Sequence, residues 1–205
     1  SVEGKVAIVT GGSRGIGEMI AAGYLANGAK VYISSRKAAV CDATAARLSK
    51  TYGGECISLP ADMSNLAGIE GFTAAFKERE NHLDILVNNA GVAWGAPLEE
   101  FPEVGWDKVM DTNVKGVFFL TQKLLPLLEK NAHTETPSHV VNIGSVDGIK
   151  TPVFDNFSYG PSKAAVHHLT RVLAAHLIKR NIIINGIAPG PFPTSMLSAG
   201  VGGGG

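Results

Sequence analysis

The hydrophobic positions of the chain gather in six short runs that are rich in Val and Ile. Each run is too short for a helix and nearly continuous rather than alternating, which is typical of strands covered on both faces of a parallel sheet. The predicted strands are residues 5–10, 30–34, 55–60, 84–88, 139–144 and 181–187.

Longer stretches with apolar residues at helical spacing separate these runs. The predicted helices are residues 15–27, 39–52, 69–80, 106–130 and 162–180. The fourth contains Pro126, which is expected to bend the helix or to end its regular part. Strands that alternate with helices imply right-handed crossovers, so the sequence predicts an α/β fold with a doubly wound parallel sheet and helices on both faces.

Length and composition favour one globular domain. The chain has 205 residues, of which 45% are hydrophobic, and its 18 basic and 18 acidic residues cancel. We expect a single domain over residues 1–199 and a glycine-rich tail over 200–205 that has little to bury. The balanced charge disfavours a nucleic-acid partner, and no apolar run reaches the roughly 18 residues of a membrane span.

Two features bear on compartment and metal binding. Cys41 and Cys56 make no disulfide framework, so a reducing compartment, the cytoplasm, is expected. His167 and His168 are adjacent and point to different helix faces, and no Cys/His cluster accompanies them. The sequence therefore predicts no metal site.

The first predicted strand runs directly into a glycine-rich turn, residues 10–17, and a helix follows at once. Glycines allow positive φ and let backbone N–H groups approach a pyrophosphate at the positive end of a helix. A P-loop has similar spacing, but Glu18 stands where its phosphate-binding lysine is needed. The usual dinucleotide spacing is also imperfect, because Ile20 replaces its third glycine. A glycine turn without a ligand is the alternative.

The residues after the second predicted strand indicate which dinucleotide would bind. An acidic residue there would bond the ribose 2′-hydroxyl of NAD, but this chain has Ser34-Ser35-Arg36-Lys37. A guanidinium attracts a 2′-phosphate, and Arg14 in the glycine turn lies on the same side. The sequence therefore predicts NADP(H) rather than NAD. The alternative is that Arg36 and Lys37 are merely solvated residues at the start of a helix.

Tyr159 and Lys163 are four residues apart, so at a helix start they share one face. A nearby ammonium favours the phenolate and is expected to lower the pKa of the tyrosine, which could then exchange a proton with a carbonyl or an alcohol. Ser145 follows the fifth predicted strand, at the end of a parallel sheet where ligands bind.

The chain resembles the short-chain dehydrogenase/reductase family over residues 4 to 197. The motifs that carry the resemblance, in the family's order, are TGGSRGIG at 10–17, Asp62, NNAG at 88–91, Asn113, GS at 144–145, YGPSK at 159–163 and PGPFPT at 189–194. The resemblance implies a Rossmann-type sheet and a homo-oligomer. Within the family, these motifs are most similar to 3-oxoacyl-thioester (beta-ketoacyl) reductases, including the type tied to rhamnolipid synthesis.

The resemblance implies four catalytic residues. Tyr159 is expected to be the general acid and base, and Lys163 to lower its pKa and to hydrogen-bond the nicotinamide ribose. Ser145 is expected to donate to the substrate oxygen. Asn113 is expected to hold a water that links Lys163 to bulk solvent.

The resemblance also implies a cofactor site. Asp62 and Met63 are expected to edge the adenine, Asn88 to meet the adenosine-side ribose, and Gly91 to keep the cofactor bed open. The phosphate turn and the 2′-phosphate are expected to involve Gly11, Ser13, Arg14, Gly15, Ile16, Gly17 and Arg36.

The end of the chain departs from the family pattern. Phe192 and Thr194 are expected to fix the amide end of the nicotinamide. Family members continue past this point into a substrate-covering helix pair and a seventh strand, whereas this chain ends in a glycine run. The expectation is that the sequence is incomplete and that residues 200–205 are placeholders.

Together these features predict an NADPH-dependent oxidoreductase that interconverts CH–OH and C=O groups, acting on a 3-oxoacyl thioester or a similar small ketone. One alternative is a dinucleotide-binding regulator that senses redox state without turnover. Another is dehydration or epimerisation of a nucleotide sugar, which the short glycine loop and modest length disfavour.

Overall fold

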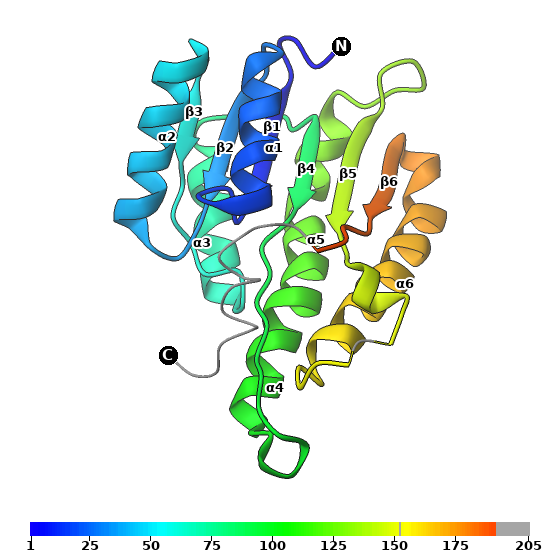
Figure 1. The fold of residues 1–205 in the computed structure, drawn as a ribbon. Helices are drawn as coiled ribbons and strands as arrows, with labels where there is room; N and C mark the ends of the chain where they lie inside the picture. Colours follow the sequence, from blue (N-terminus) through cyan, green and yellow to red (C-terminus); the bar gives the residue numbers. More distant parts are fainter. Residues whose placement is uncertain (152, 192–205) are drawn as a thin grey trace.

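The computed structural model describes residues 1–151 and 153–191. In this part of the chain, six parallel strands form one sheet in the order β3-β2-β1-β4-β5-β6 (Figure 1). The strands are β1 (Val6–Thr10), β2 (Lys30–Ser34), β3 (Cys56–Ser58), β4 (Ile85–Asn88), β5 (Ser138–Ile143) and β6 (Ile182–Ile187). This arrangement confirms the predicted doubly wound parallel sheet.

Within the described residues, six α-helices connect and cover the strands. They are α1 (Gly15–Ala26), α2 (Ala38–Tyr52), α3 (Leu66–Lys77), α4 (Glu103–Met110), α5 (Gly116–Lys130) and α6 (Tyr159–Leu177). The predicted helix 106–130 is divided by a π turn, η2 (Asp111–Lys115). Pro126 does not end the regular helix, because α5 continues to Lys130. Proline removes only one helical hydrogen bond here, on an exposed face where water can replace it.

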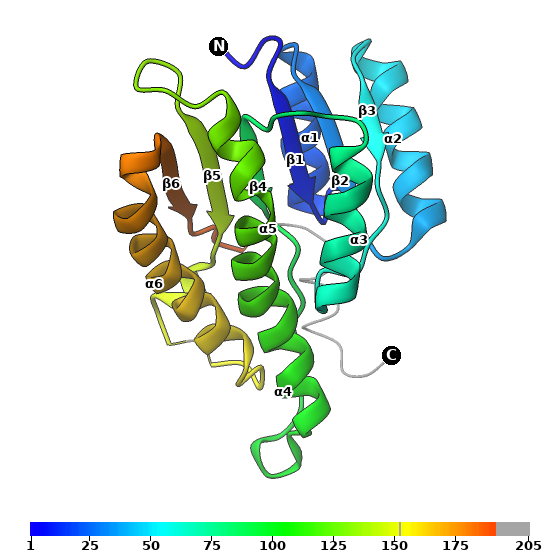
Figure 2. The same cartoon turned by 180° about the vertical axis from the view of Figure 1, so that it is seen from behind.

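Alternate residues of the strands face two separate cores. Ala7 and Val9 of β1 pack with α1 and α2, whereas Val6 and Ile8 pack with α3, α5 and α6. Figures 1 and 2 show these two helix layers on opposite faces of the sheet. Ile8 is fully buried, and burial of such a side chain contributes about 1.5–3 kcal/mol. The near-continuous apolar pattern of the strands follows from this two-sided burial.

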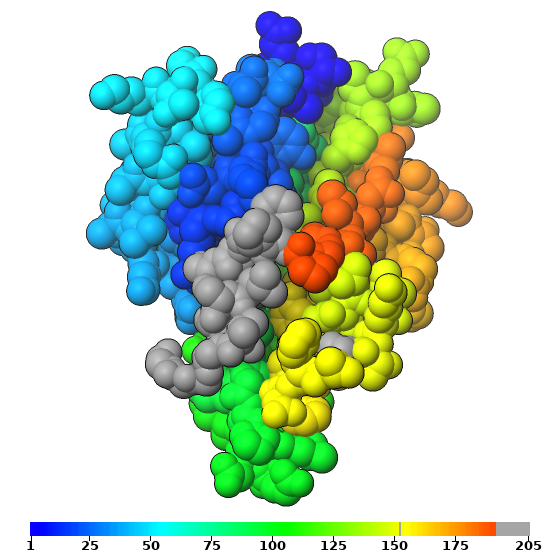
Figure 3. All heavy atoms as spheres, in the orientation of Figure 1, coloured from blue at the N-terminus to red at the C-terminus, as the bar shows by residue number. Residues whose placement is uncertain are grey.

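The sheet is not covered evenly along its width. Figure 3 shows the face of the sheet that carries α1 and α2. These helices lie over one half of that face, while β6 reaches the surface in the other half. The last residues of β6, Asn185 to Ile187, are exposed. None of the helices in the described residues is long and apolar enough to cross a membrane.

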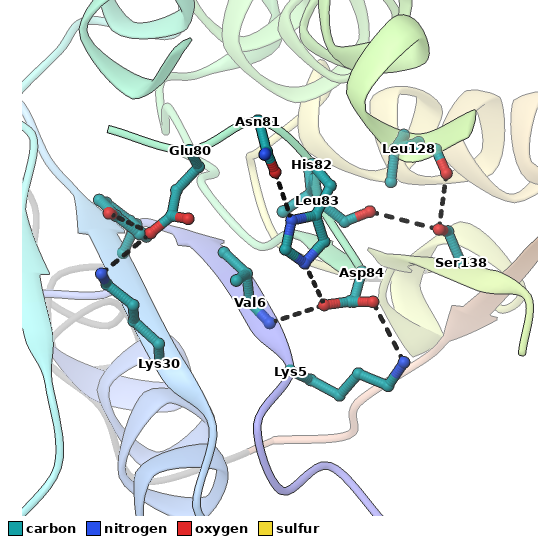
Figure 4. Close-up of polar contacts among 11 residues, drawn as sticks. Lys5, Val6, Lys30, Glu80, Asn81, His82, Leu83, Asp84, Leu128 and Ser138 are labelled. Carbon is teal, nitrogen blue, oxygen red and sulfur yellow. Dashed lines mark hydrogen bonds and ion pairs between the residues drawn. The ribbon is translucent and has the colours of Figure 1, made fainter. Parts of the chain in front are cut away.

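Polar contacts fasten the amino ends of the central strands (Figure 4). The Asp84 carboxylate accepts the Val6 N–H at 2.8 Å and pairs with Lys5 Nζ at 3.1 Å and His82 Nε2 at 3.3 Å. Nearby, Glu80 pairs with Lys30 and accepts from Tyr32, and Ser138 donates to main-chain oxygens of Leu83 and Leu128. These contacts lie at the end of the sheet opposite to Ser145.

The chain leaves β1 for β2 on one side and later returns to β4 on the other. In open parallel sheets, ligands bind outside the carboxyl ends of the strands where the order reverses in this way. Thr10 and Asn88 end the two strands that flank this point. The fold therefore places the candidate site beyond these two residues.

Candidate active site

The turn after β1 has a backbone shape that only glycine fits. Gly11 and Gly15 have φ of 64° and 55°, in the left-handed region. A Cβ at Gly17 would lie 2.3 Å from the oxygen of Gly11, and one at Gly12 would lie 2.7 Å from Ile33 Cγ2. The glycine pattern read from the sequence thus corresponds to two positions with a left-handed backbone, Gly11 and Gly15, and two positions without room for a Cβ, Gly12 and Gly17.

The same turn delivers the amino end of α1 to the strand ends. Arg14 is the residue before the helix, and its side chain makes no capping hydrogen bond. The N–H groups of the first turn are therefore not bonded to that side chain. Such N–H groups and the helix dipole attract anions. Ser13 is buried and its carbonyl accepts from Thr44, while Arg14 is exposed and Ile16 half-buried. The six predicted phosphate-turn residues therefore lie together, in the turn after β1 and the first residues of α1.

Thr10 and Asn89 attach the glycine turn to β4, and the sequence analysis did not single out either. Thr10 Oγ1 accepts the N–H groups of Asn89 and Ala90 at 3.0 and 2.9 Å. Asn89 Nδ2 donates to the oxygens of Thr10 and Gly11 at 2.9 and 3.3 Å. The signal was present in the sequence, because two consecutive asparagines stand at the end of the fourth strand and only the first, Asn88, was given a role.

Arg36 lies beside the glycine turn. Gly12 N–H donates to the Ser34 carbonyl at 3.2 Å, which joins the turn to the end of β2. Arg36 and Lys37 follow two and three residues later and are exposed, as is Arg14. Among the described residues, neither Arg14 nor Arg36 is paired with a carboxylate. Two guanidinium groups are therefore available to a phosphate at this corner.

Asp62 and Met63 follow β3, next to β2 in the sheet. The Asp62 carboxylate accepts from Ser64 N and Oγ at 2.9 and 2.8 Å, so it shapes the turn into α3. The Met63 side chain is buried in the core on the α5 side, and its carbonyl lies where a Cβ at Gly116 would collide. The structure gives both residues local contacts, and their predicted contact with adenine stays a prediction.

Asn88 is buried beneath the strand ends. Its Nδ2 donates to Thr121 Oγ1 at 3.1 Å and to Asn142 Oδ1 at 2.8 Å, and Asn142 continues to Thr170 Oγ1 at 3.0 Å. Both amide hydrogens of Asn88 are thus committed to neighbouring elements, which leaves none for a ribose. The residue lines a small cavity with Thr10, Met63, Ala90, Thr112, Gly116, Val117 and Leu120.

Asn113 sits in the π turn between α4 and α5. It is 1% exposed; Oδ1 accepts Val92 N–H at 2.9 Å, and Nδ2 donates to Val92 O at 3.0 Å and Ser162 Oγ at 2.9 Å. Ser162 Oγ in turn donates to Tyr159 O at 2.7 Å. The side chain of Asn113 therefore links the segment after β4 to the first turn of α6, and π turns are frequent at such functional positions.

Lys163 is anchored in the interior. Its Nζ donates to the Ile143 carbonyl at 2.9 Å and lies 5.6 Å from the centre of the Tyr159 ring. Burial lowers the pKa of Lys163 to about 8, because the charged form loses its hydration. A Cβ at Gly91 would lie 3.4 Å from both Lys163 Nζ and Asn113 Oδ1, so this glycine keeps the space above them narrow but open.

The direction of the Tyr159 pKa differs from the prediction. Burial raises the pKa of the Tyr159 phenol above its ordinary value, a hydrogen bond with the Ser145 side chain lowers it, and the charge of Asp147 raises it. The predicted net lowering of this pKa is wrong for this structure, because burial outweighs the contact that lowers it. At neutral pH the phenol is therefore protonated.

Ser145 stands beside Tyr159 at the end of β5. The serine is 7% exposed, and its Oγ accepts Asp147 N–H at 3.1 Å in the short helix η3 (Val146–Gly148). The structure thus gathers Ser145, Tyr159, Lys163 and Asn113 around one point at the carboxyl ends of β4 and β5. The predicted contacts of Phe192 and Thr194 lie outside the described residues.

Comparison with known proteins gives a family match over residues 5–200, to the model described as short chain dehydrogenase. The chain is 52% identical over 196 residues to the rhamnolipids biosynthesis 3-oxoacyl-[acyl-carrier-protein] reductase of Pseudomonas aeruginosa, covering 96% of this chain and 76% of that protein. It is 35% identical to a 2-dehydro-3-deoxy-D-gluconate 5-dehydrogenase of Dickeya dadantii, covering 95% and 74%.

Solved structures give the same grouping. The Pseudomonas aeruginosa RhlG/NADP active-site complex superimposes with a TM-score of 0.93 at 52% identity, covering 97% of this chain and 77% of that one. The L-sorbose reductase of Gluconobacter frateurii, complexed with NADPH and L-sorbose, superimposes with a TM-score of 0.88 at 26% identity, covering 94% and 72%.

Proposed function

The chain belongs to the short chain dehydrogenase family, and from this premise we propose that it is an NADPH-dependent reductase of a ketone, with a 3-oxoacyl thioester as the substrate class. The observation that carries the proposal is the convergence of Ser145, Tyr159 and Lys163 at the strand ends, next to the glycine turn. The similarity to a 3-oxoacyl reductase and to an NADP complex supports the substrate class and the cofactor.

The residues of the turn fit a phosphorylated dinucleotide. Gly12 and Gly17 lie where a Cβ would collide with the protein, and Arg14 leaves the amino end of α1 without a side-chain cap. Arg14 and Arg36 would hold the 2′-phosphate of NADPH, because a guanidinium binds phosphate with paired hydrogen bonds. When bound, the cofactor supplies the hydride that becomes the new C–H bond of the alcohol.

Tyr159 supplies the proton that completes the reduction. Burial keeps its phenol protonated at neutral pH, so Oη can donate a hydrogen bond and then its proton to the carbonyl oxygen of the substrate. The Ser145 hydroxyl donates to the same oxygen and stabilises the negative charge that develops there. The ketone thus gains one hydride and one proton, and Tyr159 is reprotonated from solvent.

Lys163 and Asn113 organise this pair. Lys163 lies under the Tyr159 ring with its ammonium held by Ile143 O, so it stabilises the phenolate left after proton transfer. The side chain of Asn113 is fully engaged with Val92 and Ser162, so the water it is predicted to hold would be bound by its main chain. We assign these organising roles to Lys163 and Asn113 because both residues are buried.

The test is turnover of NADPH with a short 3-oxoacyl thioester, followed by the loss of reduced-nicotinamide absorbance. The proposal expects steady oxidation by the chain and a decrease of about 10²- to 10⁴-fold in Tyr159→Phe. The dissociation constant of NADPH, measured by fluorescence titration, is expected to stay nearly unchanged in that variant. NADPH binding without turnover on a panel of thioesters, diketones and sugars would instead favour a redox sensor.

We also propose that the protein acts in the cytoplasm as a homo-oligomer. Cys41 and Cys56 are buried free thiols, which suits a reducing compartment. Trp106 of α4 and Phe118 of α5 are large apolar side chains that are 42% and 36% exposed, and a second copy would cover them. Light scattering coupled to size exclusion tests this, and a strictly monomeric mass would contradict it.

A further inference from the structure

One face of α6 follows the end of β5 along three successive turns. Tyr159, Lys163 and His167 are spaced by four residues, so they form a line along the helix. Lys163 Nζ donates to the carbonyl of Ile143, and His167 Nε2 lies 2.9 Å from the carbonyl of Ser145. The lysine and the histidine therefore hold the two main-chain oxygens on either side of Gly144.

The contact between His167 and Ser145 has one assignment that satisfies both atoms. A carbonyl oxygen only accepts, so at 2.9 Å the Nε2 of His167 carries a hydrogen and donates it. Nε2 also lies 3.4 Å from the N–H of Ser145, a longer contact that would need the other tautomer. The shorter distance favours the donor assignment.

The segment that carries Ser145 is shaped around the imidazole ring. A Cβ at Gly144 would lie 2.1 Å from His167 Cε1, and one at Gly148 would lie 2.8 Å from Cδ2. The ring thus fills a slot between two glycine backbones, one before Ser145 and one after it. A Cβ at Gly144 would displace the ring, and one at Gly148 would displace the ring or the backbone of α6.

The Ser145 carbonyl is also part of the turn that orients the hydroxyl of that residue. Gly148 N–H donates to this carbonyl at 3.0 Å and closes η3, and the same turn presents Asp147 N–H to Ser145 Oγ at 3.1 Å. A second donor on the same oxygen fixes the peptide plane from which this turn begins. His167 therefore reaches the hydroxyl through the backbone.

We propose that His167 is a positioning residue for Ser145: its Nε2–H fixes the 145 carbonyl and thereby holds the serine hydroxyl beside the Tyr159 phenol. The inference rests on the proposed reductase function, in which that hydroxyl polarises the substrate oxygen. The ring of His167 lies against the backbone of Gly144 and Gly148, so in this proposal it acts through the carbonyl of Ser145. Its effect is on the rate of the chemical step, because small displacements of a catalytic group cost up to about 100-fold in rate.

Two substitutions separate the hydrogen bond from the volume of the ring. His167→Gln keeps an N–H donor at similar reach and is expected to retain kcat within about threefold of the wild type. His167→Leu keeps the bulk but removes the donor, and it is expected to lower kcat about 10- to 100-fold with KM and the NADPH dissociation constant nearly unchanged. His168→Leu is the matched control, because that neighbour is exposed and, among the described residues, hydrogen-bonds only with Arg171; it is expected to leave kcat unchanged.

A double-mutant cycle tests the route through Ser145. In a Ser145→Ala background, with residual activity measured at high enzyme concentration, His167→Leu is expected to cause no further loss of kcat. An equal loss in both backgrounds would overturn the proposal and assign His167 a general structural role. Should His167→Leu fail to fold, a folded His167→Gln with the same loss as Ser145→Ala would overturn it equally. A wild type without any turnover would contradict the proposed function, a result distinct from an active wild type that is insensitive to His167.

Discussion

The ammonium of Lys163 is bonded to the main-chain oxygen of Ile143, at 2.9 Å, inside the protein. The side chain is 5% exposed, so the charge is held by one carbonyl and by the face of a neighbouring aromatic ring. Neither partner replaces the full hydration of an ammonium, and the pKa of Lys163 consequently falls from its ordinary value of 10.5 to about 8. The site therefore holds a charge that costs folding free energy.

This cost has a pH dependence with a definite sign. Below pH 8 both the folded and the unfolded chain carry the charge, so the full cost is present. Between pH 8 and 10.5 the unfolded chain binds more protons than the folded one, so the stability of the wild type rises with pH relative to a variant without the amine. Lys163→Met removes the buried charge, so its free energy of unfolding relative to the wild type is expected to fall by about 3 kcal/mol as the pH rises from 8 to 10.5. Urea unfolding at several pH values measures this difference.

The control for this prediction is Lys123→Met, which removes a half-exposed lysine that is paired with Glu70. Its unfolding free energy relative to the wild type is expected to vary little over the same pH range. A Lys163→Met difference that does not change with pH would show that Lys163 is not desolvated in solution.

The glycine turn gives a second prediction, based on two glycines of the same helix. A Cβ at Gly17 would lie 2.3 Å from Gly11 O, whereas a Cβ at Gly23 meets nothing within 4 Å. Gly17→Ala is expected to lower stability by about 1–3 kcal/mol and to weaken NADPH binding at least about tenfold, because the turn must shift. Gly23→Ala is expected to stabilise the protein by about 0.5–1 kcal/mol, because alanine favours a helix over glycine.

Thermal unfolding and NADPH titration measure both variants. The two variants can be compared directly, because both replace a glycine of α1 with alanine. Equal NADPH affinity for Gly17→Ala and the wild type would contradict the close approach of this helix to the turn.

The six strands and their parallel, doubly wound arrangement follow from features that the sequence carries directly. Runs such as residues 5–10 are apolar without alternation because Ala7 and Val9 face one helix layer while Val6 and Ile8 face the other. Because burial on both faces makes nearly every position of the run apolar, the sequence alone indicates it. The alternation of runs and helices then leaves few topologies.

The features that the sequence analysis missed depend on contacts between distant segments. The π turn at Asp111–Lys115 keeps the apolar pattern of residues 106–130, so no break is visible until Asn113 is seen bonded to Val92. The pKa of Tyr159 was predicted from its spacing to Lys163, but the dominant cause is burial, which spacing does not report. His167 was considered only as a metal ligand, because its partner Ser145 is 22 residues away.

The cluster around Asp84 gives a stability prediction that is independent of the site. Asp84→Ala removes the acceptor of Val6 N–H and the partner of Lys5 and His82, at the end of the sheet opposite to Ser145 (Figure 4). We expect a loss of about 1–3 kcal/mol in unfolding free energy, with kcat of the folded protein unchanged.

Salt separates the contributions at Asp84. The contact with Lys5, which is 34% exposed, is screened by salt, whereas the bond from Val6 N–H is not, so most of the loss is expected to persist at high salt. Asp42→Ala on the exposed side of α2 is the matched control and is expected to leave stability nearly unchanged. A loss for Asp84→Ala that disappears in salt would assign the cluster to surface charge alone.

The choice between the two dinucleotides depends on Arg36, which lies exposed after β2, near the glycine turn and free of carboxylate partners among the described residues. Arg36→Asp replaces a group that binds a 2′-phosphate with one that repels it and can accept from a 2′-hydroxyl. We expect NADPH to bind about 10- to 100-fold more weakly and NADH to bind no worse, measured as two dissociation constants by fluorescence titration. Arg171→Asp makes the same charge change on α6, which flanks the opposite side of the sheet, and is expected to leave the ratio of the two constants unchanged. The salt dependence of NADPH binding is expected to fall in Arg36→Asp only, because one fixed cation no longer faces the phosphate. If the ratio of the two dissociation constants is the same in Arg36→Asp and the wild type, the 2′-phosphate does not bind beside Arg36.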